Sequence, residues 1–195
     1  MSGGPETIAQ AAARLVVDDG LEYGAAKRKA ARDLERRGSR RAELPSNEAV
    51  EDEVREYLAL FQADTQPSEL ESLRRLALTW MQRLSEFRPH LTGAVWRGTA
   101  TRRSTVHIEL YCDDPKTAEI GLLDRNIRFE AVGPPDGPDL LRVEVPSQEL
   151  RDSVSLFLHV LDRDDLRGGL KPDTRGRTWR GDMPALQRLM QVEAP

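Results

Sequence analysis

The chain has 195 residues, of which 38% are hydrophobic and 5% aromatic, and its formal net charge is −4 at pH 7. This length fits one domain, or one domain with a helical extension, and the apolar fraction suffices for a buried core. The slightly acidic balance argues against a protein built to coat nucleic acid, although it leaves room for a local basic patch.

The cysteine content and the hydropathy pattern indicate the cellular setting of the protein. Cys112 is the single cysteine, so an intramolecular disulfide is excluded, and we interpret this residue as a buried structural thiol. No apolar run is long enough to span a membrane. The first ten residues lack the basic flank and apolar stretch of a signal peptide. We therefore expect a cytoplasmic, bacterial-type protein without a membrane partner.

The N-terminal part of the chain predicts about four helices. Apolar residues recur there at helical spacing in four stretches, at about 6–19, 22–37, 47–61 and 68–88. Gly20 and Gly38 are suited to end the first two helices in a left-handed conformation. Ser68 and Glu71 fit a capping box at the start of the fourth helix.

The second predicted helix has a basic side with two interpretations. Its basic residues are Lys27, Arg28, Lys29, Arg32, Arg36 and Arg37. A nucleic-acid partner would be bound through phosphate contacts of Lys27, Arg28 and Arg32. Acidic residues interrupt the run and no aromatic residue is placed to stack on bases, which favours a solvated or partner-facing surface.

The strongest strand pattern covers residues 105–112. Apolar residues alternate there with polar ones, so one face of the strand is expected to be buried and the other to be available for chemistry. The apolar set is Val106, Ile108, Leu110 and Cys112, and the opposite set is Thr105, His107, Glu109 and Tyr111.

The remaining C-terminal sequence alternates between helix and strand patterns. We expect helices near 116–125 and 184–190, and strands near 127–132, 140–145 and 153–161. The stretch 133–138 is rich in glycine and proline and predicts a loop. The long polar segment 162–182 predicts either a lid over an anionic ligand or a surface loop.

An ordered motif precedes the strand at 105–112. Its members, in order, are Gly93, Ala94, Arg97, Gly98, Thr99, Ala100 and Ser104. It resembles the minimal signature of the nucleotidyltransferase superfamily, which reads Gly-Ser, then Arg-Gly-x-Ala, then Ser-Asp-x-Asp at the start of a strand. Three positions depart from that signature: Ala94 replaces the motif serine, and Thr105 and His107 replace the two metal-binding aspartates. The chain also resembles a group of proteobacterial proteins with this degenerate motif after a helical N-terminus.

The resemblance implies an α+β fold with two parts. The first would be a helical region at 1–88, and the second a nucleotidyltransferase-like domain at 89–195 with a mixed sheet of about four or five strands and flanking helices. The turns at Gly93 and Gly98 would let backbone N–H groups approach a phosphate, and Arg97 would add charge-assisted hydrogen bonds to it. The expected ligand-binding residues are Gly93, Ala94, Arg97, Gly98 and Ser104.

The departures from the signature leave the metal site open. Paired carboxylates on alternate strand positions supply the oxygen ligands that magnesium prefers, whereas imidazole suits zinc or manganese better. In one hypothesis His107 and Glu109, with His159, bind a divalent metal (Mg, Mn or Zn) or act as acid and base. Glu130 and Glu144 are candidates for a third carboxylate. In the other hypothesis the carboxylates were lost and the pocket only binds.

The sequence thus favours a degenerate nucleotidyltransferase-like protein. It would bind a nucleotide, another phosphate ligand or a partner, with weak or no transfer activity. One alternative is an active metal-dependent nucleotidyltransferase with an altered metal site. A second alternative is a nucleic-acid or protein interaction module that uses the basic helix.

Overall fold

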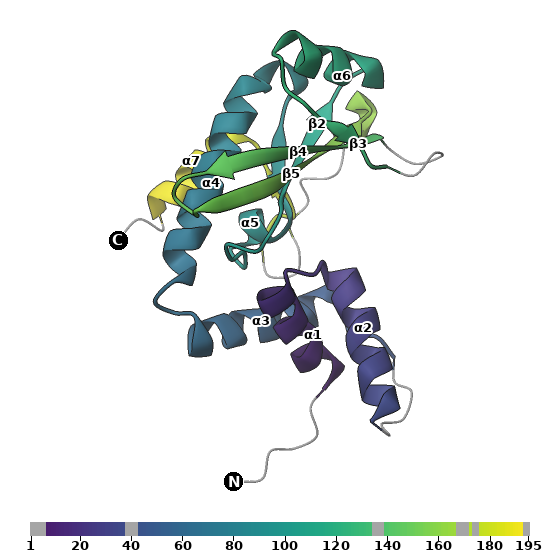
Figure 1. Cartoon of the computed structure of the whole chain (residues 1–195), viewed down its shortest axis with the longest axis vertical. Helices are drawn as coiled ribbons and strands as arrows, with labels where there is room; N and C mark the ends of the chain where they lie inside the picture. Colours follow the sequence, from purple (N-terminus) through teal and green to yellow (C-terminus); the bar gives the residue numbers. More distant parts are fainter. Residues whose placement is uncertain (1–6, 38–42, 134–138, 167–171, 173–175, 193–195) are drawn as a thin grey trace. The chain divides into compact units, whose positions relative to one another are not determined.

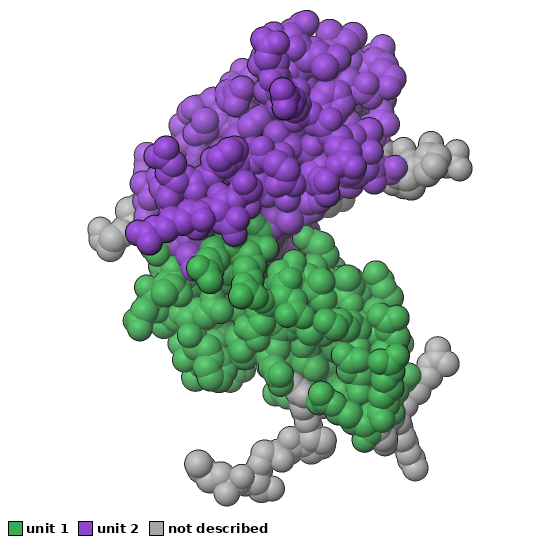
Figure 2. Space-filling model, in the orientation of Figure 1, with its two compact units in different colours: residues 1–68, 99–104 green, residues 69–98, 105–195 purple. Residues whose placement is uncertain are grey.

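A computed structural model describes residues 7–37, 43–133, 139–166, 172 and 176–192. The chain forms two compact units, one of residues 1–68 and 99–104 and the other of residues 69–98 and 105–195 (Figure 2). Its class is α+β, with helices that precede a six-stranded mixed sheet, as expected from the sequence.

The first unit is built on three helices, α1 (Ile8–Asp19), α2 (Tyr23–Arg36) and α3 (Asn47–Phe61). Thr7 and Gln10 form a capping box at the start of α1, and Gly20, with φ of 68°, ends it. Small and β-branched side chains let the three helices approach closely, and they form the core of this unit. The fully buried members of that core are Ala12, Ala13, Val17, Ala26, Ala30, Val50 and Val54.

The short segment 99–104 packs with the first unit. Gln66 donates a hydrogen bond to the Ala100 carbonyl at 2.9 Å, and the hydroxyls of Tyr23 and Thr99 are 3.3 Å apart. Ser104, one of the expected ligand-binding residues, therefore belongs to the first unit, apart from the other four, which lie in the second.

Helix α4 (Gln66–Arg83) crosses the division between the units, and most of it belongs to the second. It begins two residues before Ser68, whose hydroxyl donates to the Thr65 carbonyl at 2.9 Å. The capping box predicted from Ser68 and Glu71 was therefore wrong, because Ser68 lies inside the helix. A 3₁₀ turn, Ser85–Phe87, follows α4.

The sheet of the second unit has the strand order β3-β4-β5-β2-β1-β6. The strands are β1 (His90–Thr92), β2 (Val106–Tyr111), β3 (Glu130–Ala131), β4 (Asp139–Ser147), β5 (Asp152–Leu161) and β6 (Arg180–Gly181). The β4–β5 hairpin is its longest part (Figure 1). Strands β2 and β5 pair in parallel, whereas the other neighbours are antiparallel, so the sheet is mixed.

Side chains on alternate positions divide the sheet into two faces. One face is fully buried, with Leu91, Ile108, Leu110, Leu141, Leu156 and Leu158 almost inaccessible to water. The other face carries half-buried polar and aromatic residues, among them His107, Glu109, Phe157 and His159. The alternation expected at 105–112 is confirmed for Val106–Leu110, whereas Tyr111, expected on the available face, is only 1% exposed. The polar face is where a site can form.

Helices α5 (Gly93–Arg97), α6 (Pro115–Asp124) and α7 (Met183–Val192) complete the unit. The sequence did not predict α5, β1 or β6, and the strand expected at 127–132 is reduced to Glu130–Ala131. Gly38, most of the loop at 133–138 and part of the segment 162–182 lie outside the described residues. No helix in the described ranges is both long and apolar enough to cross a membrane.

Candidate functional site

The first glycine of the motif lies directly against His107. Thr92 of β1 is opposite His107 of β2 in the antiparallel register, and Gly93 follows Thr92 with φ of 70°. A Cβ atom at Gly93 would be 3.7 Å from Cδ2 of His107. The structure therefore brings together the motif glycine and the residue that replaces the second aspartate.

A hydrogen-bonded chain runs across β2 and β5 from Thr105 through His107 to His159. The Thr105 Oγ1 atom is 2.8 Å from His107 Nε2, and His107 Nδ1 is 2.8 Å from His159 Nε2. Phe157 is opposite His107 in the parallel register, and its ring stacks on the imidazole with centroids 5.2 Å apart and an interplanar angle of 11°. The imidazole of His107 is thus held in one orientation.

Glu109 belongs to a different cluster. Its Oε2 atom accepts hydrogen bonds from Arg180 at 2.7 Å and from the Tyr111 hydroxyl at 2.5 Å. Arg180 also donates to the Tyr111 hydroxyl and to the Asp165 carbonyl, the latter at 3.2 Å. We expected Glu109 to act together with His107. Its carboxylate instead contacts Arg180, which neutralises its charge.

This cluster predicts a loss of stability at alkaline pH. Burial, followed by the hydrogen bond to Glu109, raises the pKa of Tyr111 above its ordinary value of 10.0. Above that pH the unfolded chain releases the phenolic proton and the folded chain keeps it, so the free energy of unfolding falls as pH rises. Between about pH 10 and pH 11, urea unfolding of the Tyr111→Phe variant should show a shallower decline than the wild type. Equal slopes would contradict this role of Tyr111.

The donor set does not fit magnesium. Within the described residues no group of three or more histidine, cysteine or acidic side chains is placed to hold a metal ion. Thr105, His107 and His159 provide one hydroxyl and two imidazoles, whereas magnesium prefers carboxylate oxygens. The two candidates for a third carboxylate, Glu130 and Glu144, pair with Arg142 at 2.5 and 3.6 Å.

The other motif residues hold the backbone in place. Arg97 is buried, donates to the Thr178 carbonyl at 3.2 Å and lies 4.2 Å from the centroid of the Trp179 ring. The Ala94 carbonyl accepts from the Gly98 N–H, which ends α5 with φ of 81°. Ser104 accepts from the Thr101 N–H at 3.0 Å. These contacts make Arg97 an anchor for the C-terminal segment rather than an exposed phosphate ligand.

The basic side of α2 is partly occupied by local contacts. Lys27 donates to the Pro45 carbonyl at 3.0 Å and to Asn47 at 2.8 Å, and Lys29 pairs with Asp19 at 3.0 Å. Arg28 and Arg32 are exposed. Of the three residues expected to contact nucleic acid, Lys27 therefore already donates its hydrogen bonds to groups of the first unit.

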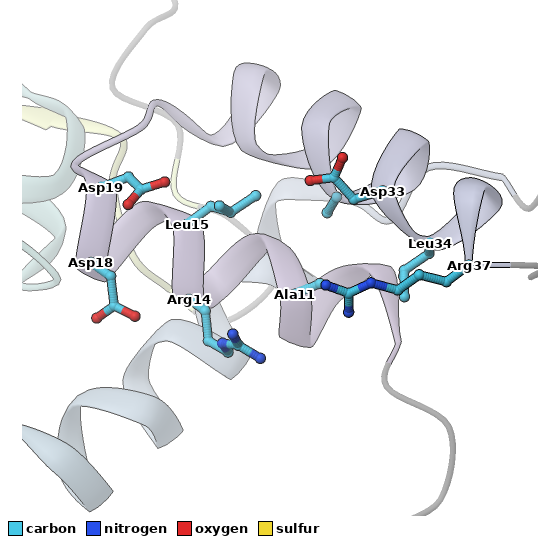
Figure 3. Close-up of a pocket in the computed structure, with 9 residues that line it drawn as sticks. Ala11, Arg14, Leu15, Asp18, Asp19, Asp33, Leu34 and Arg37 are labelled. Carbon is cyan, nitrogen blue, oxygen red and sulfur yellow. The ribbon is translucent and has the colours of Figure 1, made fainter.

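A pocket of about 170 Å³ lies between α1 and α2 (Figure 3). Apolar residues and charged residues of both signs line it. The lining residues are Ala11, Arg14, Leu15, Asp18, Asp19, Ala30, Asp33, Leu34 and Arg37. Because three carboxylates face this pocket, it offers no uniformly positive surface to a phosphate.

Sequence reasoning missed three residues of the polar face, Tyr111, Phe157 and Arg180, as parts of a site. Phe157 had a usable signal, since it is two positions before His159 in an alternating strand and so shares its face. Arg180 had none, because it contacts Glu109 across 71 positions of sequence.

Comparison with known proteins gave matches among solved structures alone. No family model and no curated protein sequence matches the chain. The Cid1 poly(U) polymerase with MgGTP bound matches at 11% sequence identity and a TM-score of 0.37. A variant of that enzyme bound to MgATP matches at 10% identity and a TM-score of 0.38. Each match covers 50% of this chain and 33% of the other, so the chain spans about a third of the polymerase chains. Similarity at this low level does not show that the chain shares the activity of the polymerase.

Proposed function

We propose that the protein is a degenerate nucleotidyltransferase-like protein that binds a nucleotide or another phosphate ligand without a metal ion. One observation carries this proposal. Gly93 lies against His107, and His107 is hydrogen-bonded to His159 and to Thr105; positions 105 and 107 are where the family signature would place carboxylates. The motif turn and the polar face of the sheet thus meet at one place in the second unit.

The electrostatics of this face support a metal-free ligand. In a working nucleotidyltransferase, divalent cations offset the repulsion between the carboxylates and the phosphates of the substrate. The groups on this face here are the Thr105 hydroxyl and the imidazoles of His107 and His159, which carry no negative charge and can donate hydrogen bonds to an anion. Phosphate oxygens can therefore approach this face without a cation between them and the protein.

Transfer activity should be weak or absent for the same reason. Nothing in the donor set replaces the two carboxylates that position magnesium ions, and Glu109 is held by Arg180 at 2.7 Å. The residues we assign to the ligand face are Gly93, Thr105, His107 and His159 in the second unit. Arg97 and Gly98 would support this face through the backbone of α5.

The test compares the wild type with a variant in which the signature is restored. Titration calorimetry with ATP should detect binding to the wild type in EDTA and in Mg²⁺ alike. The double variant Thr105→Asp/His107→Asp should bind ATP in Mg²⁺ and lose at least about tenfold in affinity in EDTA, since two carboxylates then repel the phosphates. The single variant Glu144→Gln is the control, because Glu144 is exposed and pairs with Arg142.

Two results would contradict the proposal. Binding to the wild type that requires Mg²⁺ would instead favour an active nucleotidyltransferase with an altered metal site. Wild-type and double-variant proteins that bind no nucleotide, while both remain folded, would show that this face is not a phosphate site.

A further inference from the structure

Thr105, His107 and His159 have the geometry of a nucleophile, a general base and a group that orients the base. Hydroxyl nucleophiles are activated in this way when the hydroxyl and the base, and the base and its orienting group, lie within hydrogen-bond distance of about 2.6–3.2 Å. Both distances are 2.8 Å here, and they involve opposite nitrogens of one imidazole. We propose that Thr105 is an activated nucleophile that reacts with acyl esters.

One tautomer of His107 gives the hydrogen-bond chain a direction that suits this chemistry. When the Thr105 hydroxyl donates to His107 Nε2, the Nδ1 atom of His107 carries the hydrogen and donates to His159 Nε2. The base is then the neutral tautomer with its lone pair aimed at the hydroxyl proton. No metal ion takes part, and this inference does not depend on nucleotide binding.

The surroundings of His107 keep the base in position and leave the nucleophile accessible. The Phe157 ring stacks on the imidazole at 11°, and Gly93 lies close to the same imidazole, since a Cβ atom there would be 3.7 Å from Cδ2. Thr105 is half-buried and lies between Ser104, the last residue of the motif, and the start of β2. The proposed nucleophile thus belongs to a residue that is partly exposed to solvent, while the stacked Phe157 ring holds the base.

The reaction balances without a further reagent. Oγ1 of Thr105 forms a bond to the ester carbonyl carbon, and its proton passes to His107 Nε2. The C–O bond of the ester breaks, and the leaving alcohol takes the proton from His107. Water then attacks the acyl-threonine with His107 as base, which releases the acid and restores the hydroxyl.

The nature of the orienting group narrows the substrate class. In serine hydrolases a carboxylate stabilises the imidazolium that forms during attack, whereas the orienting group here is an imidazole, which has no negative charge. The imidazolium that forms on His107 during attack therefore lacks the stabilisation that a carboxylate provides, and substrates need a good leaving group. We expect activated esters to react and amides to be inert.

A fluorophosphonate probe tests the nucleophile directly, because it labels activated hydroxyls by forming an Oγ–P bond and releasing fluoride. Intact mass should show one adduct on the wild type, and peptide mapping should place it at Thr105. Thr105→Val, which keeps the shape, should abolish labelling, and Thr105→Ser should retain it. His107→Gln should lower the labelling rate by about a hundredfold or more.

His159 acts through His107, so its test needs a readout that a structural role would not move. His159→Leu should slow labelling, whereas His159→Glu should restore or exceed the wild-type rate, since a carboxylate accepts from Nδ1–H and stabilises the imidazolium. Ser155→Ala is the control, because Ser155 donates to Glu144 at 2.8 Å and is not part of the hydrogen-bonded chain of Thr105, His107 and His159. Tryptophan fluorescence confirms folding of each variant.

Three outcomes would overturn the inference. They are an adduct mapped to any hydroxyl other than Thr105, a labelling rate unchanged in His107→Gln, and no adduct on the folded wild type. A His159→Glu variant that labels no faster than His159→Leu would remove His159 from the role of orienting group.

Discussion

Replacing Glu109 by leucine should lower the free energy of unfolding of the second unit by about 3–5 kcal/mol. The Glu109 and Arg180 side chains are only 18% and 10% exposed, and they pair at 2.7 Å. Without the carboxylate, the guanidinium of Arg180 stays in a poorly solvated place beside the Tyr111 ring. Urea unfolding followed by tryptophan fluorescence measures the effect, because Trp80, Trp96 and Trp179 all lie in the second unit.

A double variant separates charge from packing. Combining Glu109→Leu with Arg180→Met removes both charges, so much of the lost stability should return. The pair Lys116–Glu119, with an N–O distance of 2.8 Å, is the control because its lysine is 68% exposed and stays solvated without a partner, so Glu119→Gln should change stability by less than about 1 kcal/mol. A Glu109→Leu variant as stable as this control would show that the cluster is not a stabilising element.

Substituting Gly181 by alanine should destabilise the second unit by about 1–3 kcal/mol, through overpacking. A Cβ atom at this position would come within 3.0 Å of three atoms of the Trp96 ring. That ring cannot move freely, because its Nε1 donates to the Thr178 carbonyl at 2.9 Å. The same strand-to-helix contact holds the C-terminal segment on α5, so the substitution should also shift the fluorescence of Trp96.

Gly24→Ala is the control for this prediction. Gly24 lies within α2, and a Cβ atom there would meet only the flexible guanidinium of Arg28, at 3.4 Å. Alanine favours helix over glycine by about 0.5–1 kcal/mol, so this variant should be neutral or more stable. A Gly181→Ala protein that unfolds at the wild-type urea concentration would contradict the tight packing of β6 on Trp96.

Long periodic segments were predictable from the sequence. The first three helices and the strands β2, β4 and β5 have enough residues for a period of 3.6 or 2 to stand out, and each was expected close to its observed range. The alternation of β5 also placed His159 on the same face as His107, and the hydrogen bond between them confirms this.

Short elements and long-range contacts were not predictable. Strands β1 and β6 have three and two residues and α5 has five, too few to reveal a period. Gly93 was predicted to lie in a turn, but it is the first residue of α5, with φ of 70°. The ion pair of Glu109 with Arg180 was not predictable, because the order of the strands in the sheet, rather than any local sequence pattern, brings the two residues together.

The structure also changes how the motif is interpreted. Arg97 and Gly98, which suggested phosphate contacts, are explained by the Thr178 and Trp179 contacts and by the left-handed end of α5. The chemistry that remains is concentrated in Thr105, His107 and His159. One face of one sheet thus carries both the proposed anion site and the proposed nucleophile.

Metal-free binding of a phosphate ligand to this face is the central claim, and thermal melting tests it most directly. The wild type is melted with a panel of nucleotides, each in Mg²⁺, Mn²⁺, Zn²⁺ or EDTA, and followed by tryptophan fluorescence of the second unit. A ligand at a hundred times its Kd adds about 2.7 kcal/mol, which raises the midpoint by several degrees. We predict a nucleotide-dependent rise that survives in EDTA. A rise that appears only with a metal, or no rise with any nucleotide, would contradict the claim.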